Sequence, residues 1–186
     1  HNVYKLDKSQ ISLIMVSFFA GWTIVNPFLS AISDNLQKRC MPIVLTILLD
    51  AVLFSLVIFT PSLTGHIFSY NTMLVIFFFI GVATGTHPLV FALAKENFPI
   101  RIAGTVIACT NTLIMLGGLL FQPLVGILLD LHHGSTFQSY IIQQYTSSDY
   151  TFALSIIPIS LMLCLILMYF VKETGQRLSD HKDENE

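Results

Sequence analysis

Long apolar stretches alternate with short polar ones along this chain. Five of them hold roughly 20 or more mostly apolar residues, which is enough to cross the hydrocarbon core of a bilayer as a helix. They cover residues 11–32, 43–63, 73–94, 103–129 and 151–171. Because lipid offers no partners for backbone amide and carbonyl groups, each stretch must satisfy those groups internally, as a helix does. The pattern therefore predicts five transmembrane helices in an all-α integral membrane protein.

Polar and proline-containing segments separate these stretches and set the domain organisation. The segments are SDNLQKRCMP at 33–42, TGHIFSYN at 64–71, KENFPIR at 95–101 and LHHGSTFQSYIIQQYTSSDY at 131–150. We predict an extracytoplasmic lead-in over residues 1–10, one transmembrane domain over residues 11–171, and a hydrophilic cytoplasmic tail over residues 172–186.

Lysine and arginine residues give the expected orientation. Two of them, Lys5 and Lys8, lie on one side of the predicted membrane. Seven lie on the other side: Lys38, Arg39, Lys95, Arg101, Lys172, Arg177 and Lys182. Cytoplasmic flanks carry the excess of positive charge, so the C-terminus is expected in the cytoplasm, with a bacterial inner (plasma) membrane as the location. An outside N-terminus that begins with His1 indicates a C-terminal piece of a larger protein.

The composition narrows the function classes. Apolar residues make up 54% of the chain and charged residues only 11%, against about 25% charged residues in soluble domains. The net charge of −2 and the scattered basic residues do not indicate a nucleic-acid surface. Cys40, Cys109 and Cys164 are far apart and indicate neither a disulfide framework nor a metal site. We therefore expect no metal, no cofactor and no catalytic residue.

The third apolar stretch is interrupted near its middle. Gly81, Gly85 and Pro88 share one face at helical spacing, which favours a close approach by a neighbouring backbone and a bend in the helix. His87 lies on another side, near Thr84 and Phe91. An ionisable residue at membrane depth either hydrogen-bonds a carbonyl across a helix interface or faces a cavity, where it binds solute or relays protons.

Asp50, in the second apolar stretch, is the other ionisable residue at membrane depth. A carboxylate near the bilayer centre costs roughly 2.5–3.5 kcal/mol on insertion scales. Asp50 is therefore expected to be protonated, to pair with a cation from the cytoplasmic side, or to take part in coupling transport to an ion.

Small and polar residues form a stripe along the fourth stretch. Its members recur at steps of three and four residues: Gly104, Ala108, Asn111, Met115, Gly118, Gln122 and Gly126. A shorter stripe in the first stretch holds Thr23, Asn26 and Ser30, next to a bend at Pro27. Close helix packing accounts for the small residues, whereas the amides of Asn111 and Gln122 require other protein or a solute cavity.

Several segments resemble the C-terminal half of a major facilitator superfamily transporter without the first helix of that half. The family has the loop signature Gly-x-x-x-Asp-Arg-x-Gly-Arg-Arg/Lys. In SAISDNLQKR, residues 30–39, Asp34 matches the acid and Lys38 and Arg39 match the last cations, whereas Ser30, Asn35 and Gln37 depart from the signature. The segments KENFPIRIAGT, LGGLLFQPLVGILLD and VKETG also resemble the ends of the family's last two helices.

The resemblance implies most of one six-helix bundle, which rocks against a missing N-terminal half around a central site. It implies a secondary active transporter of a small organic solute by alternating access, with proton-coupled uptake of a nutrient such as an amino acid or a sugar. It places a cytoplasmic gate at Asp34, Lys38 and Arg39. It ranks Thr23, Asn26, His87, Asn111 and Gln122 above Asp50 as solute or proton contacts. The expected partners are the lipid bilayer, the solute and the missing half.

Two other functions compete with transport. A transporter-like receptor or a non-transporting remnant would share the fold. A membrane enzyme would need a cluster of catalytic groups, but His132 and His133 are adjacent in sequence and no carboxylate or cysteine accompanies them at ligand spacing. Glu96 and Arg101 flank the turn before the fourth stretch and can pair across it, although an exposed pair contributes little to stability.

Overall fold

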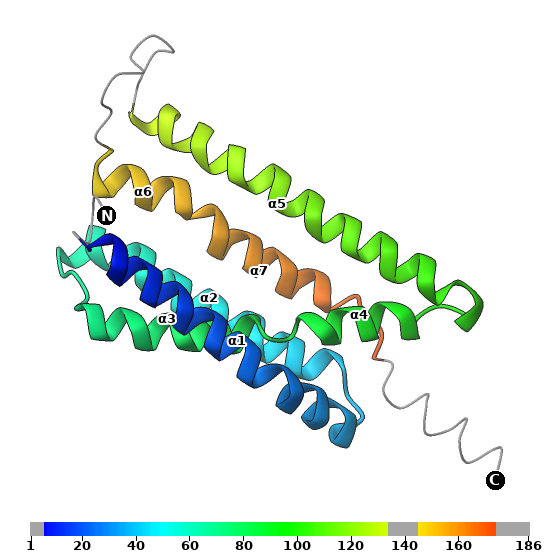
Figure 1. Ribbon diagram of the computed structural model, residues 1–186. Helices are drawn as coiled ribbons and strands as arrows, with labels where there is room; N and C mark the ends of the chain where they lie inside the picture. Colours follow the sequence, from blue (N-terminus) through cyan, green and yellow to red (C-terminus); the bar gives the residue numbers. More distant parts are fainter. Residues whose placement is uncertain (1–5, 134–144, 174–186) are drawn as a thin grey trace.

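The computed structural model describes residues 6–133 and 145–173, and every regular element in them is helical (Figure 1). The elements are α1 (Lys8–Leu36), α2 (Cys40–Thr64), α3 (Tyr70–Thr84), α4 (His87–Glu96), the short 3₁₀ helix η1 (Ile100–Ile102), α5 (Ala103–His133), α6 (Ser147–Leu154) and α7 (Ile156–Met168). They form five units long and apolar enough to span a membrane, which confirms the predicted fold class. Residues 1–5 of the predicted lead-in and residues 174–186 of the tail lie outside the described residues.

The helices associate along their lengths. Helix α1 packs against α3, α2 packs against α7, α3 and α6, and α5 packs against α6 and α4. Figure 1 shows α5 along one edge of the bundle, beside α6. The buried core is small, with Ile43, Leu89 and Leu93 at its centre. Most large apolar side chains are exposed, as expected for helices whose outer surface faces lipid or further protein.

Helix α1 is longer than its apolar stretch because polar groups complete both ends. At the start, the backbone N–H of Asp7 donates to Oε1 of Gln10 at 3.0 Å. At the end, Gln37 adopts the left-handed conformation with φ of 48°. This lets the N–H groups of Gln37 and Lys38 donate back to the carbonyls of Asp34 and Ser33 at 3.2 and 3.3 Å. The loop between α1 and α2 is therefore closed by the backbone itself.

Two of the predicted spans are broken rather than continuous. The third divides into α3 and α4, and the fifth divides into α6 and α7. In each case the first segment ends four residues before a proline, at Thr84 before Pro88 and at Leu154 before Pro158. Proline has no backbone N–H, and its ring clashes with the carbonyl four residues earlier, which explains both positions. The bend expected in the third span is thus a break.

Glycines allow α1 and α3 to pack closely. A Cβ atom added to Gly21 would lie 2.2 Å from the carbonyl oxygen of Phe78, and one added to Gly81 would lie 2.0 Å from that of Phe18. Both distances are far below van der Waals contact, so only glycine fits at either position. The predicted close approach of a neighbouring backbone at Gly81 is confirmed, and the neighbour is α1.

The stripe on α5 lies on the side of the helix away from its neighbours. All seven stripe residues are exposed, and a Cβ added to Gly104, Gly118 or Gly126 would meet no atom within 4 Å. The half-buried side of the helix holds Val106 and Ile114. Packing among the described residues therefore does not account for the glycines of the stripe.

The glycine contact predicts different effects for two substitutions of the same kind. We expect Gly81→Ala to lower the free energy of unfolding by about 1–3 kcal/mol, because its methyl group would overlap the α1 backbone. Gly118→Ala, on the open side of α5, is the matched control and should have no destabilising effect. Thermal unfolding of the purified variants in detergent would measure both. Equal stability of the two variants would contradict the close contact between α1 and α3.

Candidate functional site

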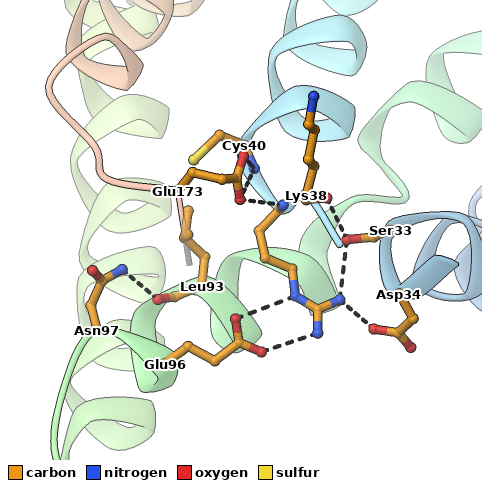
Figure 2. Close-up of polar contacts among 9 residues, drawn as sticks. Ser33, Asp34, Lys38, Cys40, Leu93, Glu96, Asn97 and Glu173 are labelled. Carbon is orange, nitrogen blue, oxygen red and sulfur yellow. Dashed lines mark hydrogen bonds and ion pairs between the residues drawn. The ribbon is translucent and has the colours of Figure 1, made fainter. Parts of the chain in front are cut away.

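Arg39 is at the centre of a charged cluster at one end of the bundle. It precedes α2, and its guanidinium donates to residues of α1 and α4. Nε and Nη2 donate to the two carboxylate oxygens of Glu96 at 3.3 and 3.1 Å. Nη1 donates to Oδ1 of Asp34 at 2.5 Å and to Oγ of Ser33 at 3.1 Å. Figure 2 shows the α1 residues on one side of this group and Glu96 on the other. One side chain therefore joins the ends of three helices.

Glu173, after α7, adds a fourth segment to the cluster. Its carboxylate accepts hydrogen bonds from the backbone N–H of Arg39 at 2.5 Å and from that of Cys40 at 3.0 Å (Figure 2). These groups belong to the beginning of α2, where amides have no partner inside the helix. Glu173 thereby caps α2 and connects the end of the chain's last span to the Arg39 loop.

Helix dipoles favour this arrangement of charges. The Arg39 guanidinium lies at the C-terminal ends of α1 and α4, where the partial charge is negative, and the Glu173 carboxylate lies at the N-terminal end of α2, where it is positive. Partial burial opposes the positive charge of Arg39, but the hydrogen bonds with Glu96 and Asp34 outweigh it and raise the pKa of the guanidinium. Arg39 therefore stays charged at every physiological pH.

The two carboxylate partners of Arg39 differ in exposure. The side chains of Arg39 and Glu96 are 13% and 9% exposed, whereas that of Asp34 is 62% exposed. Solvent screens the Asp34 pair, so the bidentate Glu96 pair makes the larger contribution. Ser33 is fully buried, and its hydroxyl donates to the carbonyl of Lys38 at 2.9 Å while it accepts from Arg39.

The sequence indicated part of this cluster. It named Asp34 and Arg39, which are in contact, and Lys38, whose side chain is exposed and whose backbone carbonyl takes part. It considered Glu96 only as a partner for Arg101, and it gave Glu173 no role. The acidic residues in the segments KENFP and VKETG could have indicated a role for Glu96 and Glu173. Only the fold, however, brings these segments to the Arg39 loop.

The structure places the predicted solute and proton contacts on several helices. Thr23 on α1 and Asn111 and Gln122 on α5 are exposed. Asn26 is half-buried, and its Oδ1 is a buried atom without a hydrogen-bond partner in the described part of the chain. His87 begins α4 and packs its ring 5.3 Å from that of Phe91, as expected for neighbours on one side of the helix. The described residues do not gather these side chains into one buried site.

Asp50 lies beside the break between α3 and α4. It is buried, and Thr84, the last residue of α3, contacts its Oδ2 at 3.3 Å. Thr46, one turn earlier on α2, contacts the hydroxyl of Thr86 just after the break at 3.2 Å. Asp50 forms none of the ion pairs found among the described residues.

The opposite end of the bundle has a second polar cluster. Oδ1 and Oδ2 of Asp149 lie 2.6 and 2.9 Å from Nδ1 of His132 and His133, respectively. Oδ2 also accepts from the backbone N–H of Thr146 at 2.8 Å. The sequence has no carboxylate at ligand spacing from the two histidines, and the structure brings one to them from the next span. No group of three or more His, Cys, Asp or Glu side chains that could hold a metal ion is found among the described residues. The cluster joins the end of α5 to the start of α6, and it explains why α6 begins before residue 151.

A sequence profile described as Major Facilitator Superfamily matches residues 2–185. The chain belongs to this superfamily, whose members are typically transporters rather than enzymes. Comparisons with curated proteins and with solved structures found no match. The chain is therefore an integral membrane protein of a transporter family, with a cluster of charged residues at one end of its bundle.

The Arg39 cluster predicts what happens when its central side chain is removed. Arg39→Ala leaves the buried Glu96 carboxylate without this partner, and we expect a loss of about 1–3 kcal/mol in the stability of this end of the bundle. The reactivity of the Cys40 thiol can measure this loss of stability, because Cys40 lies within the cluster. With Cys109 and Cys164 replaced by alanine, the alkylation rate of Cys40 should rise about tenfold, as a loss of 1.4 kcal/mol would give. Lys38→Ala is the control, and an equal rise there would contradict the central role of Arg39.

Gln37 provides a test of the loop backbone. Its φ of 48° is in the left-handed region, which costs residues other than glycine roughly 1–2 kcal/mol. We expect Gln37→Gly to raise the melting temperature in detergent and Gln37→Val to lower it. Asn35→Gly, inside α1, is the control and should lower the melting temperature, because glycine destabilises a helix. A lower melting temperature for Gln37→Gly would contradict the observed loop geometry.

Proposed function

We propose that this chain forms most of the C-terminal six-helix bundle of a secondary active transporter, which moves a small organic solute by alternating access. The observation that carries the proposal is the Arg39 cluster. Its hydrogen bonds are directional and short, so they hold while the ends of α1, α2 and α4 are together and are lost when those ends separate. Such contacts stabilise one of two conformations.

The proposed gate faces the cytoplasm. Lys38, Arg39, Lys95 and Arg101 all flank the helix ends at the Arg39 cluster. An excess of positive charge marks the cytoplasmic side of a membrane protein. This supports a cytoplasmic C-terminus in a bacterial inner membrane, and a gate that closes the cytoplasmic side of the transporter when the Arg39 cluster is intact.

The proposed solute path runs along the exposed stripe of α5. Asn111 and Gln122 present amides that can donate and accept hydrogen bonds, and Asn26 on α1 has a buried Oδ1 without a partner in the described ranges. A second bundle, absent from this sequence, would cover the stripe and enclose a cavity between the halves. Groups of this kind suit a polar nutrient such as an amino acid or a sugar.

We further propose that uptake is coupled to protons. An uncharged amide stripe binds solute but stores no charge, so coupling requires a titratable group within the membrane. His87 at the start of α4 and Asp50 on α2 are the candidates from the sequence, and both lie next to the break in the third span. An inward proton gradient would then drive accumulation of the solute.

Uptake into proteoliposomes tests the proposal. The protein, expressed with any further segment that its gene encodes, would be reconstituted and screened with amino acids and sugars under an imposed pH gradient. We expect one solute class to accumulate and Asn111→Ala to raise its KM about tenfold, as the loss of one hydrogen bond would give. Thr112→Ala is the matched control, because the Thr112 hydroxyl donates to the Ala108 carbonyl of its own helix at 2.9 Å.

Two results would contradict the proposal. Equal KM values for Asn111→Ala and the control would place the solute elsewhere. Binding of a solute without accumulation under any gradient would favour the transporter-like receptor.

A further inference from the structure

We propose that Asp50 is a proton-binding site that controls the joint between α3 and α4. The side chain is only 8% exposed, and Oδ1 has no hydrogen-bond partner among the described residues. Its polar contact there is the one with Thr84, through Oδ2 at 3.3 Å. An ionised carboxylate in such a place would be shielded from bulk solvent and would have no cation among the described residues to stabilise it.

The hydroxyl of Thr84 cannot supply the missing stabilisation. A threonine hydroxyl has one proton to donate. Thr84 Oγ1 lies 2.8 Å from the carbonyl oxygen of Ile80, which can only accept, so the proton is used in that shorter hydrogen bond. The hydroxyl can donate to Asp50 only by sharing or giving up that bond, and its contact with Oδ2 is long at 3.3 Å. An ionised Asp50 would therefore gain little from Thr84, so the geometry favours a neutral carboxyl group.

The titratable residues on the helices around α2 leave this assignment unchanged. They are Tyr70 on α3, His87, Lys95 and Glu96 on α4, Asp149 and Tyr150 on α6, and Cys164 on α7. None of them forms a hydrogen bond or an ion pair with Asp50. Glu96 contacts Arg39, and Asp149 contacts the two histidines at the opposite end of the bundle. The carboxyl group of Asp50 is therefore electrostatically isolated among the described residues.

The location of Asp50 gives its proton a mechanical effect. Asp50 contacts the last residue of α3, and Thr46, one turn away, contacts Thr86 on the other side of the break. The same face of α2 therefore touches both sides of the joint. Loss of the proton would leave a buried charge with one long hydrogen bond from Thr84, and its cost would favour a separation of α2 from the end of α3. Helix α4 is ten residues long and ends at Glu96, so movement at the joint reaches the Arg39 cluster.

This assignment deepens the proposed function, because it names the coupling site, but its first test does not depend on transport. Infrared difference spectra of the reconstituted protein, recorded during a pH titration, would show the carbonyl stretch of a protonated carboxyl group. We expect the wild-type band to be absent in Asp50→Asn, which keeps the shape of the neutral acid. Asp130→Asn, at an exposed position, should keep the band. A band that persists in Asp50→Asn would overturn the proposal.

Thr84→Val gives a second measurement that does not rely on Asp50→Asn. It keeps the shape of the side chain but removes the hydroxyl that contacts Asp50 Oδ2. The band of the protonated carboxyl group should shift, because the strength of its hydrogen bond sets its frequency. An unchanged band would show that the contact between the two side chains does not exist.

Transport then tests the coupling. In Asp50→Asn, accumulation driven by a pH gradient should fall at least tenfold, whereas solute exchange without a gradient should continue. If His87→Ala has this effect and Asp50→Asn does not, or if a sodium gradient drives uptake in place of protons, the assignment is wrong. If no solute is transported but the infrared result holds, the proposed function fails and the proton site stands.

Discussion

The bidentate ion pair between Arg39 and Glu96 connects parts of the chain that are far apart in sequence. It links the α1–α2 loop to the end of α4, and through the backbone of Arg39 it meets Glu173 after α7. The pair is sheltered from solvent, so its attraction is screened less than that of an exposed pair, and removal of one partner leaves a buried charge. In a bundle with a small apolar core, such a contact has a large effect on how the helix ends are arranged.

Many hydroxyls in the membrane-spanning helices are satisfied locally. Those of Thr60, Thr110 and Thr112 donate to carbonyls of their own helices. Others join helices, as Ser17 of α1 does by donating to the Leu74 carbonyl of α3 at 2.9 Å, beside the glycine contacts between the same two helices. Asp50 differs from these groups, because it is buried and ionisable and has no charged partner among the described residues. An isolated carboxyl group at a joint between helices costs stability, and ionisable residues within a membrane are usually functional.

The exposed stripe of α5 is the feature of this bundle that fits a transporter built from two bundles. Helices that pack on all sides have no surface for a solute, whereas α5 keeps its small and polar stripe away from its neighbours. A major facilitator bundle that carries such a face is suited to pair with another bundle. The proposed gate and the stripe along the proposed solute path lie on helices in contact, since α4 contacts α5 and bears Glu96.

The sequence determined the class of the protein, because bilayer thickness and backbone hydrogen bonding require five long apolar stretches to be helices. It also predicted the bend near Pro88 and the close face at Gly81. It did not distinguish Pro88 and Pro158, which lie in the first turn of a new helix after a break, from Pro27, Pro61 and Pro123, which lie within continuous helices. Only the tertiary structure decided which acids meet Arg39, which carboxylate meets His132 and His133, and that Asp50 has no charged partner within residues 6–133 and 145–173. These pairings depend on distances between helices, which local patterns in a sequence do not contain.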